Sequence, residues 1–494
     1  MKLINLTIRQ INEGLKKREF SAVELCKAYL EEIKQKNKKI FAFLDITEDL
    51  ALGGAKEADS LVKADKNFPL LAGIPSAIKD IILIEGVKCT AASKILENFV
   101  APYDATVIKK LKEQKAVFLG KTNLDEFAMG SSTENSAFGP TRNPNDLDRV
   151  PGGSSGGSAA AVSADMTVYA LGSDTGGSVR QPASFCGVVG LKPTYGAVSR
   201  YGLIAFASSL DQIGVIAKTV DDCRIVFDTI KGKDPLDSTS IESKIQNSKT
   251  EFPFMETRGK MKKSSSPFEI RNLKIGIPKE YFTKGLDPEI EKVIKAAIKK
   301  YEEMGAKIKE ISLPHTEYAL PAYYLINPSE ASANLSRYDG IKYGFSEKSA
   351  KNLMEVYLKT KGKGFGPEVR RRIMLGTCAL SQGFYEAYYL RAQKIRTQVR
   401  NDFEKAFEKV DVIMGPVSPV LPFKIGEKID DPLSMYLVDV YTVSINLVGL
   451  PALSLPVGKV GKLPVGLQII GKPFEEEKIL NIGEYFEKNG EFVR

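Results

Sequence analysis

Apolar and polar positions follow two different periods along this chain. Between residues 5 and 65 the apolar residues recur every three or four positions, so that Leu25, Tyr29 and Ile33 fall on one helical face. Ser21 stands just before this pattern and Glu24 three residues later, a combination typical of the capping box that starts a helix. The segment therefore predicts helices, one of which begins directly after Ser21.

From residue 73 onward, short β-branched runs alternate with helical patterns. Runs of this kind predict buried strands, and strands separated by helices predict an α/β fold whose sheet is covered by helices on both faces. The predicted strands lie within residues 73–83, 115–122, 166–174, 274–279, 411–416, 449–458 and 464–472.

One segment, 238–271, is rich in serine and lysine and has no hydrophobic period. Such a polar run buries too little apolar surface to order itself, so we predict a mobile surface insertion. The rest of the chain shows no internal repeat. We expect a single domain over 1–494, with an N-terminal helical region at 1–70, a core at 73–230 and a second half at 272–494.

The composition is that of an ordinary globular protein, since 43% of the 494 residues are apolar and 27% are charged, which allows a large core. The net charge of +9 comes mainly from scattered lysines, so it indicates solubility more than a nucleic-acid groove. No apolar run reaches the length of about eighteen residues that a membrane span needs, and the first residues lack the apolar core of a secretion signal. We therefore expect no membrane contact and a cytoplasmic location.

Cysteine and histidine counts narrow the possible chemistry. The five cysteines are far apart and form no CxxC pair, which argues against a disulfide framework and a zinc site, and we expect no metal. His315 is the only histidine, so any Ser-His-Asp triad must use it.

The glycine-serine stretch PGGSSGGSAAA, 151–161, has several interpretations. A flexible linker is disfavoured because the residues that follow are apolar enough to be core. Two overlapping GxSxG patterns, centred on Ser154 and Ser155, match the nucleophile elbow of α/β-hydrolases, which would need His315 as its base. The other interpretation is a tight turn that leads into a buried helix. The nearby LGKT at 119–122 lacks the first glycine of a phosphate loop, so the chain shows no nucleotide-binding motif.

A second small-residue stretch, GSDTGGSVRQPASFCG at 172–187, follows a predicted strand. Successive backbone N–H groups with little side-chain bulk can converge on a developing oxyanion, although the same composition also suits a plain strand-to-helix turn. The N–H groups in question belong to Thr175, Gly176, Gly177 and Ser178.

Lys79 interrupts an apolar strand in GIPSAIKDIIL, 73–83. Burial disfavours the charged form of a lysine, so a buried Lys79 would be neutral enough to act as a base near pH 7. The alternative is a lysine at a strand end whose amino group reaches the solvent.

Lys79, Ser154 and Ser178 together resemble the amidase signature family, which uses a Ser-cisSer-Lys triad. The spacing, 75 residues from Lys79 to Ser154 and 24 more to Ser178, is also similar to that of the family. The resemblance implies an α/β fold with a large mixed central sheet. It implies that Lys79 is the base, that Ser154 bridges through a cis peptide bond, and that Ser178 is the nucleophile. It further implies an oxyanion hole at residues 175–178, braced by Ser155, Asp174 and Arg180.

Other runs are similar to a branch of this family, the A subunits of glutamyl-tRNA(Gln) amidotransferases. That likeness implies a glutaminase in a heterotrimer with the B and C subunits, which converts misacylated Glu-tRNA(Gln), and often Asp-tRNA(Asn), to the amide form. It places tRNA mainly on the B subunit, ATP and Mg in a partner subunit, and no cofactor in this chain. The runs are 206–214, 234–240, 329–344, 371–377 and 431–439.

Glutamine carries an α-carboxylate and an α-ammonium group, so a selective pocket needs one cation and one anion placed apart. The resemblance assigns Arg372 to the carboxylate, Asp439 to the ammonium group and Tyr323 to the pocket wall, with Arg371 an equally good choice for the carboxylate. Two alternatives stay open, a stand-alone amidase acting on small or fatty amides and a non-catalytic scaffold.

Overall fold

The computed structural model describes residues 3–64, 68–241 and 270–490. The insertion predicted at 238–271 therefore lies almost entirely outside the described residues. Within the described ranges, eleven strands form one sheet in the order β1-β3-β2-β4-β6-β5-β10-β11-β9-β7-β8. The strands are β1 (Phe43–Ile46), β2 (Pro75–Lys79), β3 (Val117–Thr122), β4 (Tyr169–Ser173), β5 (Val189–Lys192), β6 (Ile213–Ala217), β7 (Lys274–Pro278), β8 (Lys307–Ile311), β9 (Val412–Pro416), β10 (Ala452–Val460) and β11 (Leu463–Ile470).

The sheet is mixed, as the resemblance implied. Strands β2, β3 and β4 pair in parallel, whereas β5, β6, β10 and β11 pair with their neighbours in antiparallel fashion. Each of the seven predicted runs overlaps a strand. The strands that the sequence pattern missed include both edges, β1 and β8, in which polar residues interrupt the short apolar runs.

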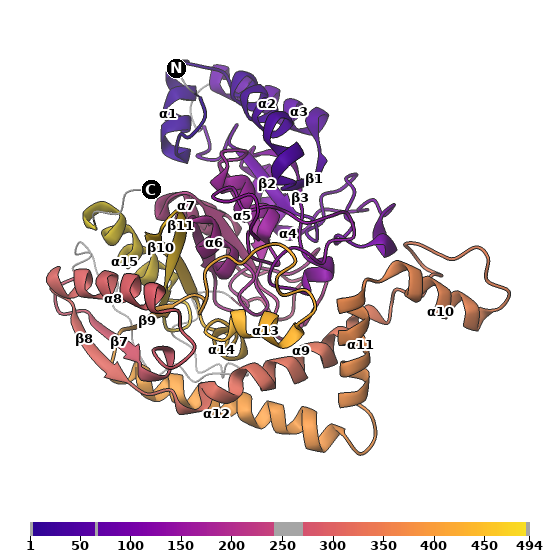
Figure 1. Ribbon diagram of the computed structural model, residues 1–494. Helices are drawn as coiled ribbons and strands as arrows, with labels where there is room; N and C mark the ends of the chain where they lie inside the picture. Colours follow the sequence, from indigo (N-terminus) through magenta and orange to yellow (C-terminus); the bar gives the residue numbers. More distant parts are fainter. Residues whose placement is uncertain (1–2, 65–67, 242–269, 491–494) are drawn as a thin grey trace.

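Helices cover the sheet and carry the chain between its strands (Figure 1). They are α1 (Ile8–Lys17), α2 (Ala22–Ile40), α3 (Glu48–Ala64), α4 (Thr106–Glu113), α5 (Gly156–Ser163), α6 (Arg180–Cys186), α7 (Val220–Ile230), α8 (Pro288–Glu303), α9 (Ala319–Leu335), α10 (Leu353–Gly364), α11 (Pro367–Ala379), α12 (Arg391–Phe407), α13 (Pro432–Tyr436), α14 (Val443–Val448) and α15 (Glu476–Asn489). Helix α2 begins at the predicted capping box, in which Ser21 and Glu24 bond each other's backbone N–H groups, and its predicted apolar face is buried.

Helices pack on both faces of the sheet, as predicted. A side chain at Gly190 of β5 would collide with Ala183 of α6, and Gly190 lies opposite Ser454 of β10. Gly483 of α15 instead packs against Leu453, the residue next to Ser454. Since neighbouring strand residues point to opposite faces, α6 and α15 lie on opposite sides of β10. The predicted α/β fold is therefore confirmed.

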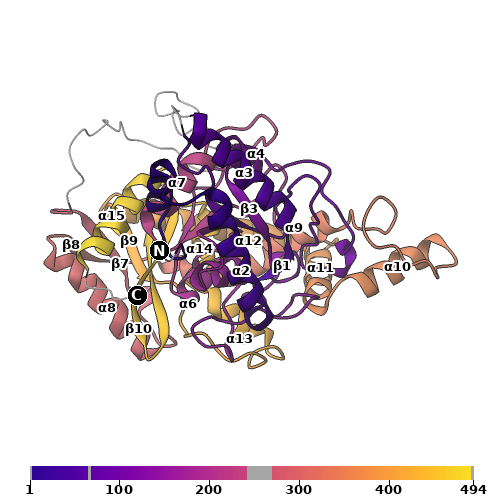
Figure 2. The ribbon, with the colours of Figure 1, turned by 90° about the horizontal axis from the view of Figure 1, so that it is seen from above.

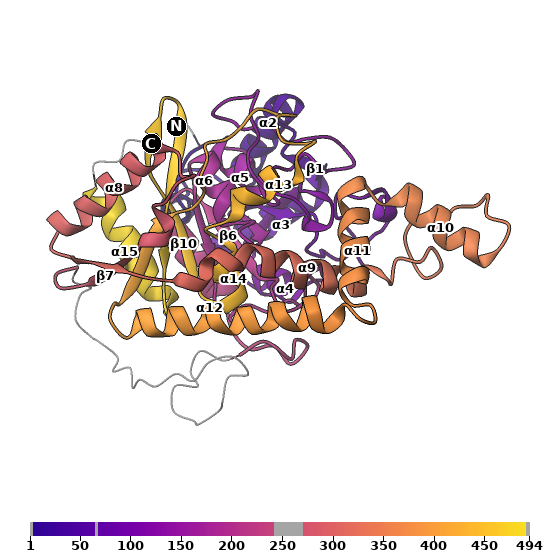
Figure 3. The ribbon, with the colours of Figure 1, turned by 60° about the horizontal axis from the view of Figure 1, so that its bottom comes forward.

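The outer helices differ in how closely they pack against the rest of the molecule. Helices α9 and α11 pack together, and α12 runs along α9 and α14 (Figure 3). Helix α10 projects from one end of the molecule in every view (Figures 1–3). Seen from above, α2 and α3 lie over the β1 and β3 side of the sheet (Figure 2). No helix in the described ranges is long and apolar enough to cross a membrane.

The predicted site residues lie at the carboxyl ends of strands in the middle of the sheet. Strands β2 and β4 are parallel neighbours, so their carboxyl ends lie at the same edge. Lys79 ends β2, and Ser173 ends β4 directly before Asp174. The turn after β4 carries the second small-residue stretch into α6, and the glycine-serine stretch 151–161 leads into α5, directly before β4.

Candidate active site

Lys79 lies in a cage of hydroxyl groups. Its Nζ lies 2.8 Å from Ser154 Oγ, 2.8 Å from Ser155 Oγ and 2.9 Å from Ser173 Oγ. The side chain is fully buried rather than reaching the solvent. Burial lowers the pKa of Lys79 to about 7, against the opposing field of the Asp125 carboxylate. Lys79 can therefore accept a proton near neutral pH.

The two serine turns meet beside this lysine. Ser155 N–H donates to Ser178 O at 3.1 Å, which ties the start of α5 to the turn before α6. The Gly153–Ser154 peptide bond is cis. Ser154 and Ser155 are fully buried, whereas Ser178 is 8% exposed. No hydrogen bond joins Ser154 Oγ to Ser178 Oγ within the described part of the chain, so the relay between them stays a prediction.

The loop before Ser178 presents backbone N–H groups without acceptors. Those of Thr175, Gly176 and Ser178 donate to no atom of the residues that the structure describes. Gly177 departs from the predicted oxyanion hole, because its N–H already donates to Asp174 Oδ1 at 2.8 Å. The orientation of this peptide turns the Gly177 donor toward the protein interior, which leaves three candidate donors in place of four.

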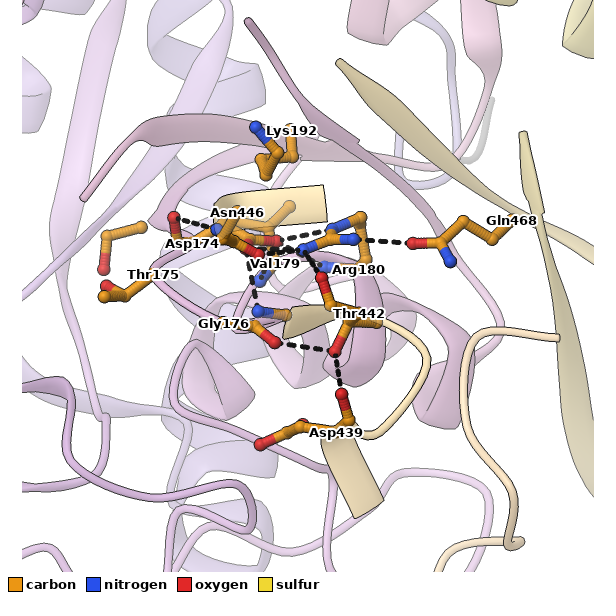
Figure 4. Close-up of polar contacts among 12 residues, drawn as sticks. Asp174, Thr175, Gly176, Val179, Arg180, Lys192, Asp439, Thr442, Asn446 and Gln468 are labelled. Carbon is orange, nitrogen blue, oxygen red and sulfur yellow. Dashed lines mark hydrogen bonds and ion pairs between the residues drawn. The ribbon is translucent and has the colours of Figure 1, made fainter. Parts of the chain in front are cut away.

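Asp174 and Arg180 brace this loop from inside (Figure 4). The Asp174 carboxylate accepts hydrogen bonds from Arg180 Nε at 3.0 Å and from Nη2 at 2.9 Å. It also accepts one from the Val179 N–H at 3.1 Å. Burial alone would favour the neutral acid, but the Arg180 guanidinium outweighs it and holds the pKa of Asp174 well below its usual range. Arg180 also reaches Gln468 Oε1 at 2.6 Å and Asn446 Oδ1 at 2.5 Å. The ion pair thus links the loop to β11 and α14.

Arg372 lies buried on α11 between aromatic rings. Its guanidinium carbon lies 5.2 Å from the Tyr324 ring centre and 5.4 Å from that of Tyr436. Nε donates to Glu368 Oε1 at 2.8 Å, while Nη1 and Nη2 donate to no residue within the described ranges. The neighbouring Arg371 side chain is 43% exposed and also pairs with Glu368. Burial therefore favours Arg372 over Arg371 as the group that faces a pocket.

Asp439 and Tyr323 complete the predicted pocket from other elements. Asp439 ends the short helix η6 (Leu437–Asp439), and its Oδ2 accepts a short hydrogen bond from Ser131 Oγ. Its Oδ1 is buried without a hydrogen-bond partner among the described residues. Burial raises the pKa of Asp439 to about 7, against the opposing field of Arg372. Tyr323 of α9 lies against Gly176, where any side chain would collide with its hydroxyl.

The structure separates His315 from the serine turns. Its Nδ1 lies 3.0 Å from Asp402 Oδ1 of α12, and no hydrogen bond in the described part connects it to Ser154, Ser155 or Ser178. A nucleophile elbow with His315 as base therefore has no geometric support. No cluster of three or more His, Cys, Asp or Glu residues that could hold a metal ion occurs in the described ranges.

Sequence reasoning missed several residues that complete this geometry. Ser173 shares Lys79 with the two predicted serines, and it stands inside the quoted GSDTGG motif, where it offered a signal. Ser131, which holds Asp439, gave no such signal because only the fold brings it to its partner. Glu368 stands four residues before Arg372 on the same helix, so this spacing was the signal that could have found it.

Known proteins resemble this chain along nearly its whole length. The family described as Amidase matches residues 24–480. The chain belongs to the amidase family. The A subunit of glutamyl-tRNA(Gln) amidotransferase from Thermoanaerobacter pseudethanolicus is 56% identical over 492 residues, which cover 100% of this chain and 98% of that protein. Its counterpart in Carboxydothermus hydrogenoformans is 54% identical over 493 residues, covering 100% and 99%.

A solved structure shares the family fold. The crystal structure of the A subunit of glutamyl-tRNA(Gln) amidotransferase from Thermotoga maritima is 44% identical and superposes with a TM-score of 0.80. The match covers 100% of this chain and 97% of that one. The chain is thus an amidase-family protein whose likeness to these relatives runs along its full length.

Proposed function

We propose that this chain is the glutaminase component of a tRNA-dependent amidotransferase. One observation carries the proposal: Arg372, whose Nη groups donate to no described residue, lies close enough to act on the pKa of Asp439, whose buried Oδ1 has no hydrogen-bond partner among the described residues. The charges of both groups also reach Tyr323, which lies against Gly176 of the loop before Ser178. Arg372 suits the α-carboxylate of glutamine and Asp439 its α-ammonium group. A small or fatty amide has neither charge, so it would leave both buried groups without partners.

Neutral Lys79 is the proposed base of the reaction. It takes the proton of Ser154, which takes the proton of Ser178, and Ser178 Oγ then attacks the side-chain amide carbon of glutamine. The N–H groups of Thr175, Gly176 and Ser178 stabilise the tetrahedral oxyanion. When the intermediate collapses, the C–N bond breaks and the proton returns through Ser154 to the leaving nitrogen, which departs as ammonia.

Water completes the cycle by the same route. It attacks the ester carbon of the acyl-enzyme while the relay accepts its proton. The bond between that carbon and Ser178 Oγ then breaks, the relay returns the proton to Oγ, and glutamate is released. Ser155, Asp174 and Arg180 hold the two turns in register through the bonds described above. No cofactor of this chain takes part in these steps.

The names of the relatives supply the biological setting. We propose that ammonia passes to the partner B and C subunits of a heterotrimer. There one of the partners, with ATP and Mg, activates the carboxylate of misacylated Glu-tRNA(Gln), and the tRNA binds mainly to the B subunit. We also propose that the complex works in the cytoplasm. If the purified chain alone bound ATP tightly, this division of labour would be wrong.

The test measures ammonia release from glutamine by the chain co-expressed with its partner subunits. We expect glutamine to be hydrolysed with a far higher kcat/KM than an uncharged amide such as benzamide. A matched substrate set, in which the α-carboxylate or the α-ammonium group is missing, should lose turnover with each deletion. Equal turnover of uncharged amides would support the stand-alone amidase instead, and no hydrolysis of any amide would support a scaffold.

A further inference from the structure

A single threonine connects the predicted ammonium anchor to the predicted oxyanion loop. Thr442 is fully buried between η6 and α14. Its Oγ1 lies 2.6 Å from Gly176 O and 3.0 Å from Asp439 O, and its N–H donates to Asp439 O at 2.9 Å (Figure 4). The same residue therefore contacts both halves of the site.

With the bond from Thr442, both polar groups of the Gly176–Gly177 peptide are hydrogen-bonded. The carbonyl of the Gly176–Gly177 peptide accepts from Thr442, and the N–H of the same peptide donates to Asp174 Oδ1 at 2.8 Å. A peptide unit is planar, so bonds at both ends fix its rotation about the chain. This rotation sets the directions of the flanking N–H groups of Gly176 and Ser178, which are candidate oxyanion donors.

The space around Gly177 leaves no room for a side chain. Gly177 has φ +137°, a conformation that residues with side chains rarely adopt. A Cβ at this position would lie 2.3 Å from Thr442 Oγ1. Arg180 Nη2 in turn donates to Thr442 O at 3.2 Å, so the buried ion pair also fixes the backbone of the threonine.

We infer that Thr442 is a positioning residue that holds Asp439 and the Gly176–Gly177 peptide at a fixed separation. The inference rests on the proposed function, since it assigns a purpose to that separation. When the α-ammonium group of glutamine binds Asp439, the side-chain carbonyl then arrives at oxyanion donors that are already aligned. The hydroxyl of Thr442 acts on the chemical step through the loop, while Asp439 itself acts on binding.

Two substitutions separate the hydroxyl from the shape of the side chain. Thr442→Val keeps the branched shape and removes the hydroxyl, and Thr442→Ser keeps the hydroxyl. In the complex with its partners, we expect Thr442→Val to lower kcat for glutamine by about 10- to 100-fold, because small displacements of catalytic groups carry costs of this size. We expect its KM to change less than about threefold, and Thr442→Ser to retain most of kcat.

Thr167→Val is the matched control. Thr167 is equally buried, and its hydroxyl lies 3.2 Å from the carbonyl oxygen of Pro75, before the start of β4 and so away from the site. We expect its kcat to stay within about twofold of the parent, with a similar fall in Tm to that of Thr442→Val. Equal losses of kcat in Thr442→Val and Thr442→Ser would overturn the inference. An unchanged kcat in Thr442→Val, or a raised KM alone, would also overturn it.

A second substrate keeps this test distinct from that of the proposed function. If the parent complex ignored glutamine but hydrolysed benzamide, the proposed function would fail. The Thr442→Val and Thr442→Ser pair would then be measured on benzamide, where the oxyanion loop is still required. The same contrast in kcat there would support the role of the hydroxyl in the loop, and its absence would overturn it.

Discussion

Lys79 and Lys192 lie in buried strands of the same sheet, yet their amino groups meet different surroundings. Burial lowers the pKa of each to about 7. Lys79 Nζ touches three serine hydroxyls, whereas the one acceptor that the described residues give Lys192 Nζ is the carbonyl of Pro193 at 2.7 Å. Burial makes a lysine neutral enough to act as a base, but only the neighbouring hydroxyls give it a proton to take.

Lys121 of β3 extends the comparison to a third outcome. It is as buried as the other two, but its Nζ lies 3.1 Å from Asp80 Oδ1. Burial opposes the charge, yet Cys89 and the Asp80 carboxylate together outweigh it and raise the pKa of Lys121. Three buried lysines in one sheet thus divide by their partners into the proposed base Lys79, Lys192 with only a carbonyl partner, and Lys121 in an ion pair.

The largest effect should come from removing the proposed nucleophile, Ser178. We expect Ser178→Ala to lower kcat for glutamine by about 10³-fold or more, because no other group replaces the attacking oxygen. The Tm should hold, since the Ser178 hydroxyl makes no hydrogen bond within the described ranges. Steady-state kinetics of the complex measure the change, with Ser163→Ala on the far end of α5 as control. A loss below tenfold would leave the nucleophile assignment without support.

The lysine pair tests the comparison itself. We expect Lys79→Met to lower kcat/KM by about 10²- to 10³-fold, the range that a lost general base accounts for. Lys192→Met, an equally buried change of the same kind, should stay within about threefold of the parent. Similar losses in both variants would show that burial and not the hydroxyl cage decides activity.

The next largest effect should be a difference in KM between variants of the two neighbouring arginines of α11. Arg372→Lys keeps the charge but removes the fork that matches a carboxylate, and we expect KM for glutamine to rise by about 10-fold or more. Arg371→Ala, at the more exposed neighbour, should change KM less than about threefold. The reverse ranking in initial-rate measurements would move the carboxylate contact to Arg371.

The smallest expected effect is the pH dependence. Lys79 must lose its proton to act as the base, and Asp439 must lose its proton to attract an ammonium group. Because both have a pKa of about 7, kcat/KM for glutamine should rise with pH and level off above that value. Lys192→Met should leave the midpoint unchanged. A profile that is flat or falls between pH 6 and 8 would contradict this assignment.

The fold and the residues around Lys79 could be predicted from the sequence better than the pocket could. Lys79 stands out because a charge interrupts an apolar run, and the serines stand in glycine-rich motifs that leave few interpretations. The sequence could not decide whether Arg371 or Arg372 contacts the carboxylate, because that choice depends on which side of α11 is buried. Thr442 could not be predicted, since its bond to Gly176 depends on how the turn between η6 and α14 packs against the loop before α6. Glu368 stands four residues before Arg372 on α11, so its ion pair could have been predicted from helical spacing. The edge strands β1 and β8 lack an apolar run.

The most direct test of the central claim is to treat the complex with a diazo-ketone analogue of glutamine and map the adduct by mass spectrometry. The account predicts a covalent adduct on Ser178 that excess glutamine prevents, because the reagent needs both the nucleophile and the glutamine pocket. An adduct on Ser154 or Ser155, or none with the partners present, would contradict it.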